Sequence, residues 1–199
     1  MIPIAVNPGN LVLGPSTLYV APFGTTEPPD SAVTPNGPSN PPPSPWTDVG
    51  GTDGGVTFES DSTYTGLQVD QIIMQVGARL TDLKVTVTAK LSEMTLNNIN
   101  QAFNSLAVLS SGTGYETMEL PVGNSATQPT YAALLIDGWA PVTTGGVSAL
   151  RRVIVRKVLA QSKVTLTGDK KTQQSLDVTW QAYFVSSSIR PFHIVDQQA

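Results

Sequence analysis

The clearest pattern in this sequence is a strict alternation of apolar and polar residues that runs from Leu83 to Leu91. Leucine, valine and alanine occupy the odd positions, and lysine and threonine lie between them. A half-buried β-strand requires a period of two, which a helix cannot use. A second alternation, from Ser175 to Val185, predicts another such strand. Its expected inner face is Leu176, Val178, Trp180, Ala182 and Phe184.

The period changes directly after the first of these runs. Four apolar residues recur there at intervals of three and four, and they predict one stripe of a helix that packs on the sheet: Leu96, Ile99, Phe103 and Leu106. Ser92 is expected to cap this helix, with Glu93 near its positive end. Four amide residues are expected to face water: Asn97, Asn98, Asn100 and Gln101.

Several shorter runs predict further strands. They cover residues 11–23, 56–60, 66–76, 130–139, 149–160 and 162–167, with a Ser/Thr turn between the second and third. The run from Tyr131 to Ile136 is almost continuously apolar, which is typical of a strand buried on both faces. Many short strands separated by turns indicate a mainly β protein, a sandwich or barrel with one packed α-helix.

Proline sets apart one segment of the chain, residues 24–45, which holds eight prolines among Gly, Ser and Asn. Proline fixes φ and removes an amide donor, so this segment predicts a long extended loop rather than a strand or helix. We expect a single domain over residues 1–199, with an N-terminal arm (1–10), this loop insertion (24–45) and a C-terminal arm (188–199). The loop and the N-terminal arm are expected to become ordered only against neighbouring copies.

Composition narrows the function classes. The chain has 199 residues, 13% of them charged, and a net charge of −4, which argues against a freely acting nucleic-acid binder. It contains no cysteine, and therefore no disulfide or thiolate site. There is no run of about 18 apolar residues and no signal-peptide pattern, so membrane insertion is not expected.

Catalytic signatures are not found in the sequence. One histidine, His193, and no cysteine cannot form a His/Cys zinc site. The nucleophile elbow, the phosphate loop and the dinucleotide fingerprint do not occur. Glu59 and Asp61 lie two apart, as paired carboxylates could, but a solvated strand face looks the same. We therefore expect no enzymatic activity, no cofactor and no metal.

The charges are unevenly distributed along the chain. Up to residue 140 there are twelve acidic and three basic residues, whereas eight basic and three acidic residues follow. An acidic half and a basic half suit head-to-tail self-association, in which unlike surfaces meet. The alternative is that both surfaces are simply solvated.

Three segments, taken in order, resemble the major tail protein, or tail tube protein, of long non-contractile-tailed bacteriophages. They are residues 46–58 (WTDVGGTDGGVTF), 69–71 (VDQ) and 91–99 (LSEMTLNNI), about a quarter of the chain with the stretch between them. The resemblance implies a β-sandwich with one helix, in homo-hexameric rings that stack into a tube for DNA, without enzymatic activity. It also implies a protein of the virion tail, assembled in the host cytoplasm, whose partners are the tape measure, tail terminator and distal tail proteins. The Pro-rich insertion departs from the family.

For a tube, DNA must pass through the lumen without binding to it, so an acidic or neutral wall is expected. The candidates are Thr57, Glu59, Gln68 and Asp70, and the candidates for inter-subunit and inter-ring contacts are Arg151, Arg152, Arg156 and Lys157. Two alternatives remain: a carbohydrate-binding β-sandwich module, and a tail decoration or minor tail protein. A sugar-binding module needs an aromatic platform, whereas Trp46 is interpreted as a loop anchor and Trp139 and Trp180 as core residues.

Overall fold

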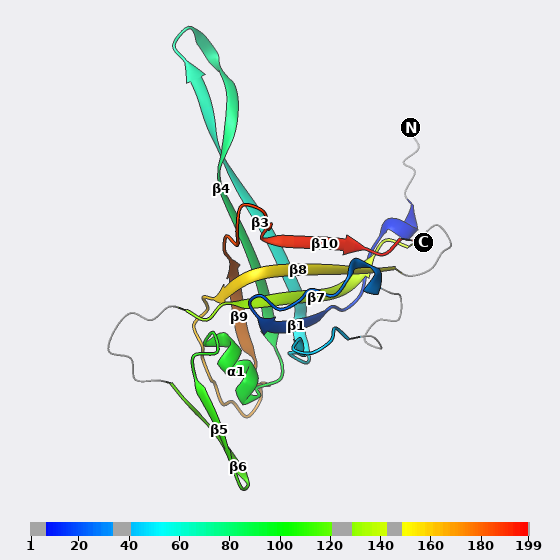
Figure 1. Cartoon of the computed structure of the whole chain (residues 1–199), viewed down its shortest axis with the longest axis vertical. Coiled ribbons are helices and arrows are strands. Elements are labelled where there is room, and N and C mark those ends of the chain that lie inside the picture. The colour runs from blue at the N-terminus through cyan, green and yellow to red at the C-terminus, as the bar shows by residue number, and fades with distance from the viewer. Residues whose placement is uncertain (1–6, 34–40, 121–128, 143–148, 199) are drawn as a thin grey trace.

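The computed structural model describes residues 7–33, 41–120, 129–142 and 149–198 (Figure 1). Within these ranges the chain is mainly β. Its strands are β1 (Thr17–Pro22), β2 (Thr47–Asp48), β3 (Thr52–Val69), β4 (Ile72–Leu91), β5 (Val108–Gly112), β6 (Tyr115–Glu119), β7 (Ala132–Ala140), β8 (Ala149–Ala160), β9 (Leu176–Ala182) and β10 (Phe192–Asp196). The helices are α1 (Leu96–Ala102) and the 3-10 turns η1 (Pro8–Asn10) and η2 (Asp30–Ala32).

Eight of these strands form one antiparallel sheet that folds over on itself. Its order is β2-β1-β7-β8-β9-β4-β3, with β10 also paired to β8. Only Val158–Ala160 of β8 pair with β9, so the sheet has two halves that run in different directions in Figure 1. Leu134 and Val155 from one half share a core with Val87 and Trp180 from the other. The predicted fold class, a mainly β sandwich with one packed helix, is confirmed.

Strands β7 and β8 join the two cores of the molecule. Leu134 and Ile136 of β7 point into the main core, and Leu135 between them points into a second cluster with Trp46 and Ile154. This burial on both faces is the arrangement that the continuous apolar run predicted. The predicted bounds of the strand over residues 149–160 match β8.

Helix α1 begins later than predicted. Thr95, not Ser92, is its N-cap, and its side chain accepts a hydrogen bond from the Asn98 amide at 3.2 Å. Glu93 lies before the helix and accepts instead from the Gly51 amide at 2.9 Å. At Gly50, where φ is +83°, a Cβ would lie 2.2 Å from the Glu93 carboxyl carbon, so this Gly-Gly turn requires its first glycine.

The helix also ends earlier than predicted, after seven residues. Asn104 and Ser105 have positive φ values of 57° and 53°, which turn the chain away. Leu106 is consequently 39% exposed and lies outside the core, so its expected packing role is wrong. Ile99 is buried in the main core, and two further stripe residues are partly buried against it: Leu96 and Phe103.

Two asparagines of α1 are buried, although they were expected to face water. Asn98 donates through Nδ2 to the carbonyls of Val49 and Glu93, both at 2.8 Å. Asn100 accepts from the Ala107 amide at 3.0 Å and donates to the Ala107 carbonyl. Their amides satisfy backbone groups of the irregular segments beside the short helix, which a hydrophobic residue could not do.

Strands β3 and β4 form one long hairpin, which corrects the prediction of separate strands. The Ser/Thr-rich residues expected to turn lie within β3, and the turn is at Asp70 and Gln71. Threonine favours strands as well as turns, and here cross-strand pairing decides between them. Thr65 and Thr81, for example, share a hydrogen bond across the pair.

Other predictions are wrong at the ends of paired strands and in the segments between strands. Leu83 and Phe184 continue the apolar alternations but lie beyond the segment in which β4 pairs with β9, and they are 44% and 73% exposed. Residues 162–167 form no strand, and Leu166 is exposed. The hairpin of β5 and β6 was not predicted, because its Ser- and Gly-rich sequence indicated only turns.

The Pro-rich loop packs on its own chain in its described parts, 24–33 and 41–45. Trp46 anchors it as predicted, because the indole Nε1 donates to the Thr26 carbonyl at 3.2 Å, and Val33 is buried. The expectation that the loop is ordered only against neighbouring copies is wrong for these parts, while residues 34–40 lie outside the described residues. The expected C-terminal arm contains β10, which belongs to the sheet.

Candidate functional site

The feature that stands out is the outer part of the β3–β4 pair, residues 61–84, which extends beyond the sandwich (Figure 1). We call it the projecting hairpin. Every residue in it except Gly66 is exposed, whereas Val85 is the first residue of β4 to be buried. Neither of its faces is therefore covered by the rest of the described chain.

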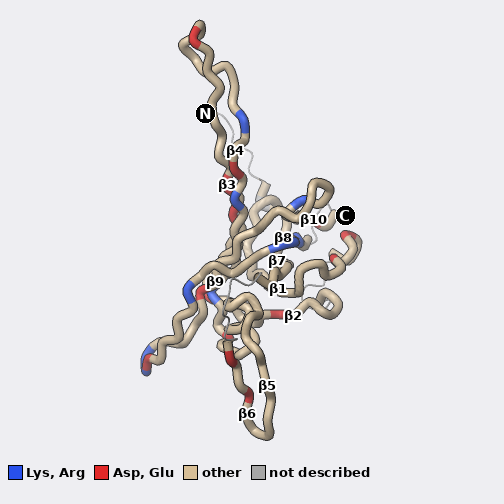
Figure 2. Tube along the Cα trace, turned by 60° about the vertical axis from the view of Figure 1, so that its left-hand side comes forward, with Lys and Arg blue, Asp and Glu red and all other residues tan. Residues whose placement is uncertain are grey.

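The projecting hairpin carries more apolar surface than a solvated ribbon needs. Nine of its exposed residues are large and hydrophobic: Tyr64, Leu67, Val69, Ile72, Ile73, Met74, Val76, Leu80 and Leu83. Charges are sparse along its outer part (Figure 2). Asp70 lies in the turn, and within the described ranges it forms no ion pair. An exposed apolar surface of this kind marks an interaction site.

A groove of 890 Å³ lies at the base of the projecting hairpin. Leu83 of β4 lines one side, and Phe192 and Ile194 of β10 contribute further lining, with Ile189 and Arg190 from the preceding segment. The Phe192 ring packs edge-on against Phe58 of β3, 5.3 Å between centroids, which ties β10 to the base of the hairpin.

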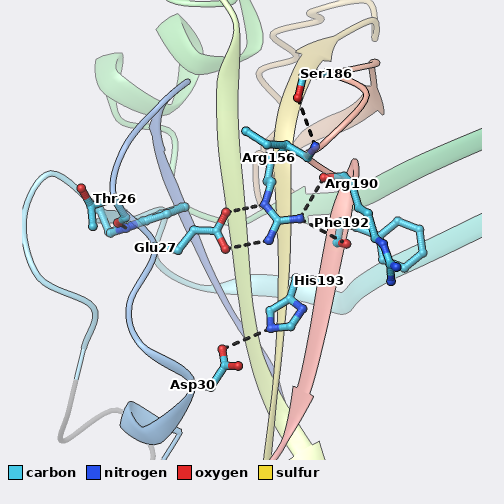
Figure 3. Close-up of polar contacts among 10 residues, drawn as sticks. Thr26, Glu27, Asp30, Arg156, Ser186, Arg190, Phe192 and His193 are labelled. Carbon is cyan, nitrogen blue, oxygen red and sulfur yellow. Dashed lines mark hydrogen bonds and ion pairs between the residues drawn. The ribbon is translucent and has the colours of Figure 1, made fainter.

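Polar contacts hold the residues around this groove (Figure 3). Arg156 of β8 forms a bidentate ion pair with Glu27 of the Pro-rich loop, and its Nη1 donates to the Arg190 carbonyl at 2.8 Å. His193 of β10 contacts Asp30 of η2 at 3.1 Å. These contacts join the loop, β8 and β10, so the groove is formed in the single chain.

The four basic residues expected at subunit contacts are all engaged within the chain. Arg152 is 4% exposed and pairs twice with Asp137 at 2.7 Å, so the expectation that it lies at a contact is wrong. Arg151 and Arg156 pair with carboxylates, and Lys157 lies over the Tyr131 ring, 4.2 Å from its centroid. Two of these pairs, Arg152 with Asp137 and Arg156 with Glu27, join the basic half of the sequence to its acidic half within one molecule, so these two arginines are not free to attract a second copy.

The four lumen candidates are all exposed, but they do not share one surface. Thr57 and Glu59 lie on the outer face of β3, opposite threonines of β4. Strand alternation puts Gln68 on the other face, and Asp70 lies in the turn of the projecting hairpin. The apolar residues of that hairpin were missed as a site because the pattern of residues 66–76 resembles a core strand.

Groups that suit other functions are not assembled in the described part of the chain. It contains no cluster of three or more His, Cys, Asp or Glu residues that could hold a metal ion. Trp46 and Trp180 are buried, and Trp139 packs so closely on Gly14 that a Cβ there would lie 2.0 Å from the indole. Two of the three tryptophans are therefore closed to sugar rings, whereas Trp139 is half-buried, which corrects its interpretation as a core residue.

No helix in the described ranges is long and apolar enough to cross a membrane.

The ion pair between Arg151 of β8 and Asp196 of β10 gives a pH-dependent prediction. The hydrogen bond from Arg151 lowers the pKa of Asp196, and their side chains are 42% and 37% exposed. A lowered pKa means that the pair stabilises the fold above the ordinary aspartate pKa of about 4, and that this is lost as pH falls through the lowered value. Solvent screening limits the effect, so Asp196→Asn should cost less than about 1 kcal/mol at pH 7. Urea unfolding from pH 7 to pH 3 tests this: a cost that does not shrink with falling pH contradicts it.

Comparison with known proteins identifies no family. No protein-family model and no curated protein match the chain. Among solved structures, one described as the crystal structure of Hcp protein aligns with 82% of this chain and 86% of its own, at 14% identity and a TM-score of 0.30. A likeness of this size supports no conclusion about function.

Proposed function

We propose that this protein is a structural virion protein, which self-assembles into stacked hexameric rings that form the tail tube of a long-tailed bacteriophage. The observation that carries the proposal is the projecting hairpin, an exposed apolar ribbon on an otherwise well-packed sandwich. An isolated two-stranded ribbon is marginally stable in water, and this one gains stability when its apolar side chains are covered.

A second copy of the chain is the partner that this surface favours. In a homopolymer every copy supplies both the hairpin and the surface that covers it, so no further protein is needed. The number of copies per ring, the stacking and the place in the virion rest on the resemblance of residues 46–58, 69–71 and 91–99 to tail tube proteins. The tape measure, tail terminator and distal tail proteins are proposed as partners on the same ground.

The outer face of β3, β4 and β9 suits the channel wall. Four threonines, Thr57, Thr86, Thr88 and Thr179, lie on it, and the hydroxyls of Thr88 and Thr179 are 3.5 Å apart across two strands. Lys90, a cation on this face, is paired with Asp53, and Lys84 lies opposite Asp61 in the strand register. A cation that is already paired, as Lys90 is, holds phosphates less strongly, which favours passage of DNA without binding. Glu59 remains a lumen candidate on this face, whereas Asp70 does not.

Electron microscopy of the purified protein, with size-exclusion chromatography and light scattering over a range of concentrations, tests the function. We expect rings and tubes with sixfold symmetry at high concentration and smaller species on dilution. A protein that stays monomeric at every concentration, or forms assemblies without a channel, contradicts the proposal. Pull-down on immobilised glycans serves as the control for the sugar-binding alternative, and no retention is expected.

A further inference from the structure

We infer that the groove at the base of the projecting hairpin is the docking site for the turn of the same hairpin on a second copy. The inference rests on the proposed function, because it names the contact through which copies join. The groove is defined by Leu83, Arg190, Phe192 and Ile194, and the turn by residues 70–74.

The groove offers both apolar surface and an open strand edge. Arg156 donates its amide to the Pro191 carbonyl, and the Gln197 amide donates to the Leu150 carbonyl, so the odd-numbered residues of β10 bond to β8. The backbone groups of Phe192, Ile194 and Asp196 therefore point away from β8. The Phe192 carbonyl accepts from Arg156 Nη1 at 3.5 Å, so the open part of this edge is at Ile194 and Asp196. In the described ranges no strand pairs with this edge, and an added strand could bond there while its side chains enter the groove.

The turn of the projecting hairpin has matching properties. Ile72, Ile73 and Met74 open β4 and are exposed, and Met74 retains 76% of its accessible surface. An extended apolar strand end of this kind fits beside a strand edge in an apolar groove. A flexible methionine also adapts to the shape of the surface that it meets.

Charge favours the same pairing. Asp70 in the turn and Arg190 beside the groove are both exposed, and neither forms an ion pair within the described part of the chain. By contrast, Arg156 at the groove is already engaged by Glu27. Docking the turn would bring the free carboxylate toward the free guanidinium, which favours this orientation over the reverse.

The chain cannot make this contact with itself. Leu83, at the groove, pairs with Ser62, and the turn begins eight residues further along β3 at Asp70. At about 3.3 Å per residue the turn lies roughly 26 Å from the groove along a ribbon that points away from it. Donor and acceptor are thus different surfaces of one copy, and a contact between such surfaces propagates from copy to copy.

Charge reversal tests the contact. Asp70→Arg and Arg190→Asp should each raise the protein concentration needed for assembly roughly tenfold, and the double variant should return it to within about threefold of the parent. Glu116→Arg and Lys171→Asp, exposed reversals elsewhere on the surface, are the matched controls and should change it less than about threefold. Circular dichroism of each variant checks the fold.

A cross-linking experiment gives a second, independent readout, because the chain has no cysteine of its own. The double variant Ile73→Cys with Ile194→Cys should form a ladder of disulfide-linked oligomers on oxidation, since every copy carries donor and acceptor. The control, Ile73→Cys with Leu109→Cys on β5, should not exceed dimers.

The outcomes separate the two proposals. If the parent forms tubes while neither reversal weakens assembly, or while the double cysteine variant gives no ladder, the docking site is wrong and the proposed function stands. If the reversals weaken assembly but the double variant fails to recover it, the pairing of Asp70 with Arg190 is wrong. A parent that remains monomeric overturns the proposed function, and the docking site with it.

Discussion

Assembly should be abolished when the outer part of the projecting hairpin is removed, while the sandwich remains folded. Replacing residues 63–82 with Asn-Gly joins Ser62 to Leu83, which are partners in the native register, by a two-residue hairpin turn. The main core contains no residue of the deleted segment, so its packing is retained. We expect a monomer by light scattering, with the near-ultraviolet circular dichroism of the buried Trp180 preserved.

A variant that keeps the hairpin separates its length from its apolar surface. Replacing Ile72, Ile73 and Met74 together by threonine keeps side chains suited to a strand but removes the apolar turn, and should prevent tubes as the deletion does. The matched control replaces three polar residues of the same hairpin, Thr63, Thr65 and Thr81, by serine, and tubes should still form. Tubes from the deletion variant would show that the hairpin is not the assembly element.

The second large effect concerns the ion pair buried between β7 and β8. Arg152 is 4% exposed, and its two nitrogens donate to the two oxygens of Asp137 at 2.7 Å. Asp137→Ala leaves this guanidinium buried without a counter-charge, so we expect a loss of about 3–5 kcal/mol in the free energy of unfolding. Equilibrium urea unfolding of the monomeric protein measures it.

Two further variants show where that loss arises. Asp196→Ala breaks the neighbouring ion pair between Asp196 and Arg151. Both of these side chains are much more exposed, so the variant should lose less than about 1 kcal/mol in the free energy of unfolding. Replacing both buried partners, by Asp137→Leu with Arg152→Met, should recover most of the stability, because no charge is then left in the core. A cost below about 1 kcal/mol for Asp137→Ala would mean that water reaches Arg152 in solution.

The alternation of residues along the chain was sufficient to predict the fold class and the best-packed strands. Where β4 and β9 pair, the apolar positions predicted for their inner faces include residues that the structure buries in the main core, among them Val87, Leu176 and Trp180. Periodicity succeeds there because a strand with neighbours on both sides must bury one face. The residues of that face alternate within the strand's own sequence, so a short window of residues is enough to identify them.

What lies against each face was decided only by the tertiary structure. Leu83 and Phe184 continue the same alternations as their buried neighbours, but no strand covers them. The pairing of Arg152 with Asp137, like that of Arg156 with Glu27, depends on strand register and on chain segments far apart in the sequence. The sequence pattern therefore indicated two charged halves, where the fold brings opposite charges together within one molecule.

The candidate site shows the same division most clearly. Residues 66–76 have the apolar content of a core strand, and from the sequence alone they predict a strand of the sheet. The structure extends them away from the sandwich, with Ile73 and Met74 exposed in the single chain. Removing water from a hydrophobic side chain lowers the free energy, and this holds whichever surface covers the side chain, because the hydrophobic effect is not directional. Whether its own domain or another molecule removes that water depends on where the backbone carries it, which only the folded structure determined.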